Sequence, residues 1–228
     1  AHKTVNPFKL QVTMRFSQEV QWADEDVQIG VLQDLASNAS IALGRALDLV
    51  GIHKINPLTG TVSSLVKEGL VDTKQSVQLA GTKYDEVIEA AAGMIISSGY
   101  VPSGIAMDPT LSFGLSTMRD ANGRKIYPEI GFGQNLTNFA GMTAAVSDTV
   151  SAKNEITPDT KLLGIVGQFD AFRWGVQRSI GAHLIEYGDP DGLGDLQRQN
   201  QIAIRAEIVY GIGIMDQAAF TKIVKAEG

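Results

Sequence analysis

The chain has 228 residues with 19 basic and 25 acidic side chains, giving a net charge of −6 at pH 7. This acidic balance disfavours a protein that grips nucleic acid through a clustered basic face. Hydrophobic residues make up 44% and charged residues 19%, which is typical of a globular chain, and the lack of cysteine excludes disulfides and thiolate chemistry. The apolar stretch 90–96 is far shorter than the roughly 20 residues of a membrane span, so no membrane partner is predicted.

Residues 8–16 alternate apolar and polar side chains, which predicts a half-buried strand. Nothing before this segment predicts a partner strand, although a lone strand is not stable in water. It therefore pairs with a distant strand or with another subunit, or the natural chain begins earlier. The apolar side of the strand consists of Phe8, Leu10, Val12, Met14 and Phe16.

A long helix is predicted next, over residues 24–50. Three acidic residues open it, an apolar ladder with 3-4 spacing follows, and Gly51 supplies the stop. At about 1.5 Å per residue, the helix would be about 40 Å long, longer than a domain of this size can cover on all sides. Its many small residues indicate that something packs close against it.

The middle of the chain predicts a helix, a strand and another helix. The first helix covers residues 83–98, with Thr82 as N-cap and Gly99 as C-cap. A short strand follows over 101–107. An Asp-Pro pair then opens a helix over 108–119, because proline is favoured at the first helical position.

The C-terminal part is mostly strand. A buried strand is predicted over 161–169, and residues 172–184 alternate on either side of Arg178-Ser179 as an antiparallel pair. Apolar residues at alternate positions over 202–214 predict an unusually long strand, and Asp216 is expected to cap a final helix through Lys225. Neither a strict βαβ order nor an all-β pattern emerges, so the predicted class is α+β.

Motifs that carry chemistry are weak in this sequence. Asp189, Asp191 and Asp195 superficially resemble a calcium loop, but an EF-hand needs glycine at position 6 and glutamate at position 12, where this chain has glycine at position 4 and Asn200 at position 12. A polar turn is the better interpretation. Arg205 and its neighbour two residues on, Glu207, predict an ion pair on one face of the long strand.

No enzyme site emerges from the sequence. The histidines His53 and His183 have no serine and acid partner nearby, so neither predicts a hydrolytic triad. The glycine pairs at 131–133 and 211–213 lack the third glycine and the strand-to-helix context of a dinucleotide fingerprint. We therefore predict no catalytic residue, no cofactor and no metal ligand.

Several stretches together resemble the HK97-like major capsid proteins of tailed bacteriophages. In that family, a strand with a glycine-containing phrase leads into a hairpin, an acidic loop and a long strand with an Arg-x-Glu core. An Asp-x-Asn-Gly-Arg turn and a Leu-x-Gly-hydrophobic phrase are also similar to family patterns. The stretches that carry the resemblance, in order, are 115–124, 138–142, 162–170, 188–191, 199–207 and 216–220.

The resemblance implies an HK97-like fold with a long spine helix at 24–50. The strand at 8–16 would be the returning half of an extended loop that reaches over a neighbouring subunit, so its five apolar residues would lie between subunits. The outgoing half of that loop, an N-terminal arm and any scaffolding segment would be missing. The implied division is an extended-loop strand at 1–16, a peripheral domain at 17–81 and 160–207, and an axial domain at 82–159 and 208–228.

The function implied is structural. Identical subunits of a phage, or of a prophage copy, would form pentamers and hexamers and then an icosahedral virion shell around DNA bound without sequence specificity. The expected partners are other copies, a scaffolding segment, a maturation protease and a portal, with assembly in the bacterial host cytoplasm. One branch of the family forms an isopeptide crosslink, for which Lys3 and Lys9 are available, but no partner asparagine can be placed.

Two alternatives stay open at this point. An encapsulin-like cellular compartment shares the fold and would enclose a cargo enzyme. A soluble metabolic enzyme would instead use scattered carboxylates such as Asp85, Glu86 and Asp170 as acid and base, and would need a strongly perturbed carboxylate in a deep cleft.

Overall fold

The computed structural model describes residues 5–27, 30–132, 136–157 and 159–226. The chain forms two compact units. Unit 1 consists mainly of Asp48–Arg173 and Ile212–Gly228, and unit 2 consists of Val5–Leu47 and Trp174–Gly211. Helices and strands are mixed in both, so the predicted α+β class is confirmed.

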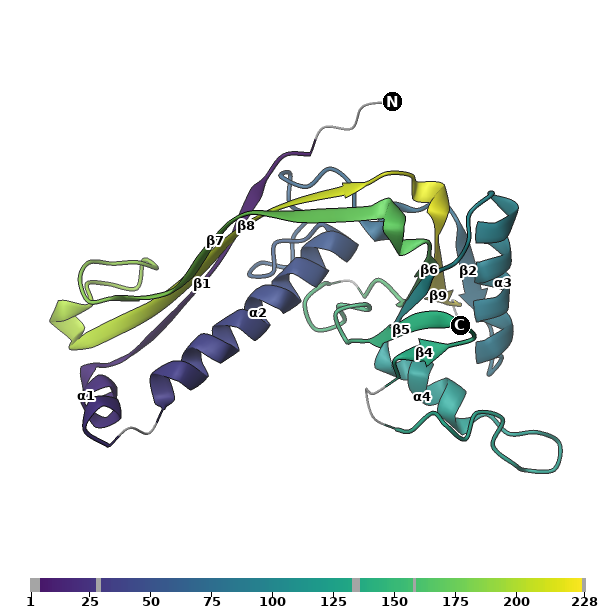
Figure 1. The fold of residues 1–228 in the computed structure, drawn as a ribbon, viewed down its shortest axis with the longest axis horizontal. Coiled ribbons are helices and arrows are strands. Elements are labelled where there is room, and N and C mark those ends of the chain that lie inside the picture. The colour runs from purple at the N-terminus through teal and green to yellow at the C-terminus, as the bar shows by residue number, and fades with distance from the viewer. Residues whose placement is uncertain (1–4, 28–29, 133–135, 158, 227–228) are drawn as a thin grey trace. The chain divides into compact units, whose positions relative to one another are not determined.

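Unit 2 is built on a three-stranded sheet with the order β1-β8-β7 (Figure 1). β1 runs antiparallel to β8 over ten residue pairs, from Phe8 opposite Tyr210 to Ser17 opposite Gln201. The predicted strand at 8–16 therefore pairs with a distant strand of its own chain. The bounds are Phe8–Ser17 for β1, Phe172–Ile185 for β7 and Gln201–Ile214 for β8.

The predicted antiparallel pair within 172–184 is wrong, because β7 is one continuous strand. Neither Arg178 nor Ser179 has the positive φ that a tight hairpin turn requires. The chain reverses later, between β7 and β8, where Gly188, Gly192 and Gly194 have φ values of 84°, 80° and 106°. Glycine adopts this left-handed backbone without steric cost.

The predicted helix at 24–50 is two helices. α1 covers Gln18–Val27 and α2 covers Val31–His53. Gly30 between them has a φ of 77°, a conformation that cannot continue a right-handed helix. Gly51 lies inside α2 and does not stop it; the Phe172 ring passes 3.1 Å from the position of a Cβ at Gly51, so the close packing explains this glycine.

Part of α2, Gln33–His53, is long and apolar enough to cross a membrane by length and composition alone. One such helix is weak evidence, because core helices that never meet a lipid pass the same test. No membrane function follows from it.

Unit 1 contains a six-stranded mixed sheet with the order β2-β9-β6-β3-β5-β4. β2 is parallel to β9 and β3 is parallel to β5, while the other neighbours are antiparallel. All six residues of β6 are buried, as its central place in the sheet requires. The strands are β2 (Ser76–Leu79), β3 (Gly104–Met107), β4 (Asn138–Phe139), β5 (Met142–Val146), β6 (Leu162–Gly167) and β9 (Phe220–Lys225).

Two helices complete the core of unit 1. α3 (Tyr84–Ser97) buries Val87, Ile88 and Ile95 in the same apolar cluster as residues of the sheet. α4 (Pro109–Thr117) begins as predicted, because the Asp108 carboxylate accepts a hydrogen bond from the Thr110 N–H at 2.7 Å. The predicted N-cap of α3 is wrong by one residue: Lys83 holds that position, without a side-chain hydrogen bond.

The predicted final helix over 216–225 is also wrong. Asp216 does accept a hydrogen bond from the Ala218 N–H, but only a single turn, Gln217–Ala219, follows before β9. The sequence of β9 is rich in the β-branched and aromatic residues that favour strands, and Phe220, Thr221 and Ile223 are buried between β2 and β6. Burial in the sheet outweighs the capping signal.

Candidate assembly surface

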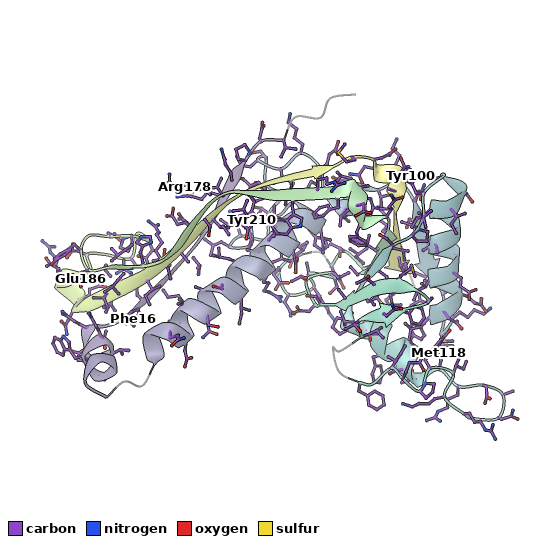
Figure 2. All side chains as sticks on the ribbon, viewed as in Figure 1. Phe16, Tyr100, Met118, Arg178, Glu186 and Tyr210 are labelled. Carbon is purple, nitrogen blue, oxygen red and sulfur yellow. The ribbon has the colours of Figure 1, made fainter. Side chains whose placement is uncertain are left out.

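β7 forms an edge of the three-stranded sheet in unit 2. Its residues from Arg173 to Ser179 are exposed, and the labelled Arg178 marks this part of the strand in Figure 2. Trp174 is 56% exposed and Val176 is 47% exposed. A long edge strand with free backbone groups and apolar side chains is a template for pairing with another chain. This edge was not singled out from the sequence, because the predicted hairpin would have covered it.

The predicted intersubunit residues share one face of β1, but they differ in burial. Phe8 and Leu10 are buried within the chain, and the Phe8 ring lies 6.3 Å from the ring of Tyr210 on β8. Val12, Met14 and Phe16 are half-buried. Only the second half of this face therefore has apolar area left for another subunit.

The opposite face of β1 and β8 is polar. Lys9 lies 3.4 Å from Glu207, and Arg205 Nε lies 3.5 Å from the same carboxylate. Arg205 also donates to the Thr13 hydroxyl at 3.2 Å. The predicted ion pair between Arg205 and Glu207 is confirmed and lies along β8. The contacts of Glu207 with Lys9 and of Arg205 with Thr13 connect β8 to β1.

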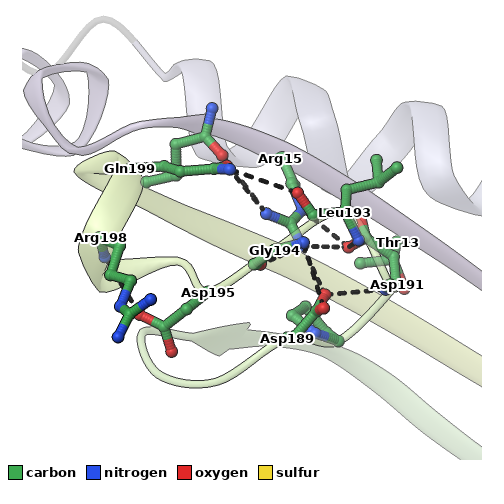
Figure 3. A network of polar contacts seen from close by, with 12 residues as sticks. Thr13, Arg15, Asp189, Asp191, Leu193, Gly194, Asp195, Arg198 and Gln199 are labelled. Atoms are coloured by element: carbon green, nitrogen blue, oxygen red, sulfur yellow. Dashed lines mark hydrogen bonds and ion pairs between the residues drawn. The ribbon is translucent and has the colours of Figure 1, made fainter.

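Arg15 fastens the loop between β7 and β8 onto β1 (Figure 3). Its guanidinium donates to Asp191 through Nε at 2.8 Å, to Asp189 through Nη2 at 2.9 Å and to the Gly194 carbonyl at 2.8 Å. The hydrogen bond to Asp191 raises the pKa of Arg15, and Arg15 in turn lowers the pKa of Asp191. We call this arrangement the Arg15 clamp.

The clamp also explains the three aspartates that resemble a calcium loop. Asp189 accepts hydrogen bonds from the backbone N–H groups of Gly192 and Gly194, at 2.8 and 3.1 Å. Asp195 accepts one from the backbone N–H of Arg198, at 3.0 Å. Their oxygens therefore bind backbone amides and a guanidinium. This is the polar turn that the sequence predicted, with an arginine partner that the sequence did not indicate.

In unit 1, His53 is buried, and its Nε2 lies 2.9 Å from the Val150 carbonyl and 3.2 Å from that of Thr149. Burial lowers the pKa of His53. Its contacts are with backbone oxygens and include no nucleophile. His183 lies on the exposed strand β7.

The three carboxylates considered for an enzyme do not share a site. Asp85 lines an open cavity of about 440 Å³ in unit 1, whose lining includes neither Glu86 nor Asp170. Glu86 pairs with Lys83 at 2.7 Å, and Asp170 lies in a short turn before β7. The lining residues include no histidine, serine or lysine, so this cavity holds no serine–histidine pair of the kind used by hydrolases.

Comparisons with known proteins agree with the fold. The family model of the phage capsid family matches residues 1–225. A solved structure from Mycobacterium phage Ogopogo is 47% identical with a TM-score of 0.89, covering 97% of this chain and 76% of that one. A structure from Gordonia phage Cozz is 32% identical with a TM-score of 0.85, covering 99% and 72%.

A curated relative, the probable major capsid protein gp17 of Mycobacterium phage D29, is 22% identical over 241 residues, which span 99% of this chain and 72% of the relative. These relatives come from phages, so the encapsulin alternative is not favoured. The chain belongs to the phage capsid family: it has the HK97-like fold and is a major capsid protein, a structural subunit of a phage shell.

Proposed function

We propose that this capsid subunit assembles with identical copies into pentamers and hexamers, which close into an icosahedral shell around packaged DNA. The observation that carries the proposal is the exposed β7 edge with its apolar side chains. Contacts in such rings are heterologous, because one surface of a subunit meets a different surface of its neighbour. Each contact can be modest, since many of them act together.

In this proposal, unit 2 takes the role expected of a peripheral domain and unit 1 contains the axial domain. The boundaries then fall at residues 47, 173 and 211, where the compact units divide, and replace the boundaries expected near 81, 159 and 207. The expected extended-loop strand at 1–16 is then part of unit 2 from residue 5 onward, because β1 belongs to the sheet of that unit, and residues 1–4 lie outside the described part of the chain.

The intersubunit residues proposed here combine the two apolar surfaces of unit 2. Val12, Met14 and Phe16 keep the role expected of them, because they retain exposed area. Trp174 and Val176 on β7 join them, because about half of each side chain is exposed, although the Trp174 ring also packs against Tyr210. Phe8 and Leu10 instead stabilise the subunit itself.

The remaining parts of the proposal follow the capsid role. The net charge of −6 suits a container whose wall should release its DNA, so DNA is enclosed without sequence-specific contacts. Assembly takes place in the cytoplasm of the bacterial host and involves a scaffolding segment, a maturation protease and a portal. The subunit is not an enzyme.

The proposal is tested by electron microscopy and light scattering of the chain in its natural length. Closed shells or ring-shaped capsomers are expected. The double variant Trp174→Asp, Val176→Asp should stay a folded monomer, because it places charge on the exposed edge and leaves the core of unit 1 intact. Leu58→Asp with Val62→Asp, which also places two charges at exposed apolar residues but in unit 1, is the matched control and should still assemble. A wild-type chain that remains a strict monomer would contradict the proposal.

A further inference from the structure

The cavity of unit 1 lies among α3, the segment 127–130 and the turn between β4 and β5. Its floor is apolar and includes Ile88, Ile130 and Phe139, all of them buried. A volume of about 440 Å³ falls within the range of ligand-binding pockets, roughly 300–1,000 Å³. The cavity is therefore large enough to receive a long side chain.

Three carboxylates line this apolar groove: Asp85, Glu89 and Glu129. They act on Tyr127 in the same lining, whose pKa is raised by burial and by these three negative charges. Glu89 and Glu129 form no ion pair with the described residues of the chain. An apolar groove lined by free carboxylates suits a cation on an aliphatic stem, which is the chemistry of arginine and lysine.

The same unit carries a projecting basic turn. Residues 119–125, which we call the basic turn, follow α4 and are closed by a bridge between Arg119 and Lys125; they extend from unit 1 just beyond the labelled Met118 (Figure 2). The Asp120 carboxylate accepts hydrogen bonds from the N–H groups of Asn122 and Arg124, both at 2.9 Å. These bonds fix the turn before any partner binds, which lowers the entropy cost of docking.

Arg124 is the unpaired cation of the basic turn. Arg119 donates to the Gly123 carbonyl at 2.8 Å, and the Lys125 ammonium lies 4.6 Å from the centre of the Phe132 ring. Among the described residues, the side chain of Arg124 has no hydrogen bond or ion pair, although Glu129 is only five positions away. The turn therefore presents one free guanidinium, which its own chain does not use.

We propose that the basic turn of one copy docks into the cavity of a neighbouring copy, with the Arg124 guanidinium between Glu89 and Glu129 and its aliphatic stem on the apolar floor. The inference rests on the proposed function, since it supplies a contact for the ring. The basic turn and the cavity are different surfaces of one subunit, so the contact between two copies is heterologous. Such a contact can repeat from each copy to the next around a ring. Charge complementarity and the preformed turn select a second copy as the occupant.

Crosslinking tests the contact directly. The chain has no cysteine, so introduced thiols are the only ones present. Particles of a Glu89→Cys, Arg124→Cys variant are treated with a short bis-maleimide and then denatured. A ladder of covalent oligomers up to the closed ring is expected. Each single variant should give monomers, as should the matched control Glu89→Cys, Lys153→Cys, which places the second thiol at an exposed lysine of unit 1.

Charge reversal tests the same contact without a crosslinker. Arg124→Glu should reduce the yield of particles about tenfold or more, and so should Glu89→Arg with Glu129→Arg. The three substitutions together should restore the yield, because the charges are again opposite. Lys153→Glu, an equal change of charge elsewhere on unit 1, should leave the yield unchanged.

The outcomes separate this inference from the proposed function. If wild-type particles form but the double-cysteine variant gives only monomers and Arg124→Glu assembles normally, the docking is overturned while the capsid role stands. A second outcome would also overturn the docking. In particles of Glu89→Cys with Arg124 intact, spermine could slow the reaction of the introduced thiol with maleimide. The cavity would then be open to a free cation and not occupied by the basic turn. If the wild-type chain forms no particles, the proposed function itself fails.

Discussion

The two units cover their strands to very different degrees. In unit 1, every residue of β6 is buried, and strands lie on both sides of it. In unit 2, β7 is exposed from Arg173 to Ser179 and has a free edge. Unit 1 thus buries its central strand in its own core, whereas unit 2 keeps an exposed edge, which we propose a neighbouring copy covers. A shell protein needs both, because each subunit must fold before it can bind its neighbours.

The largest expected loss of stability is at Phe220 in unit 1. This residue is fully buried in β9, and its ring packs edge-to-face against Phe169 with centroids 5.7 Å apart. Phe220→Ala should lower the free energy of unfolding by about 3–5 kcal/mol, because a large buried ring leaves a cavity. Val176→Ala on exposed β7 is the control and should change it by no more than about 0.5 kcal/mol. Urea unfolding measures both, and equal losses would contradict the contrast between the units.

A second prediction concerns pH and the interior of unit 1. Burial holds the pKa of His53 below its usual value of about 6.5, despite the nearby charge of Glu155. Below about pH 6.5 the unfolded state therefore binds more protons at His53 than the folded state does. The free energy of unfolding is highest above this pH and decreases as pH falls toward the pKa of His53 in the folded state. The loss from this one group is at most about 1.4 kcal/mol per pH unit.

Unfolding free energies at several pH values between 7.5 and 5 measure this loss. His53→Gln should flatten the decline, whereas His183→Gln, on the exposed strand of unit 2, should not. A decline that is unchanged in His53→Gln would show that another group titrates in this range.

The smallest expected effect is local to unit 2. Arg15→Met removes the guanidinium that holds Asp189 and Asp191, so amide hydrogens of the loop between β7 and β8 should exchange faster while unit 1 keeps its protection. Because Arg15 lowers the pKa of Asp191, the clamp is fully formed above the usual aspartate pKa and loosens as pH falls below about 4.

Lys9→Met removes an ion pair on the same polar face of β1 and is the control for the clamp. It should leave exchange in the loop unchanged. Equal exchange in the wild type and in Arg15→Met would show that the loop is ordered without the clamp.

The alternation of apolar and polar residues correctly predicted the strands that bury one face of their sheet. The alternation at 8–16 and at 202–214 was sufficient, because a half-buried sheet imposes a period of two on the sequence. The capping signal at Asp108 was also reliable, since cap and helix are local neighbours. The resemblance to capsid proteins then supplied the family, which the comparisons confirm.

The errors arose where distant contacts decide the structure. The final helix was wrong because β9 gains its place between two strands that lie far away in sequence. Gly30 and Gly51 look alike as helix interruptions, yet one has a positive φ and breaks the helix while the other lies under the Phe172 ring. The clamp was missed for the same reason, since Arg15 and Asp191 are 176 positions apart.

The pairing of β1 with β8 also sets the order of events during synthesis. Phe8 leaves the ribosome well before its partner Tyr210, which follows about 200 residues later. Loops of this length slow folding, because closure entropy is lost before the contact forms. Unit 2 therefore completes its sheet only after β8 has been synthesised. Truncated chains cannot build this sheet, and incomplete translation products are excluded from any contact that depends on it.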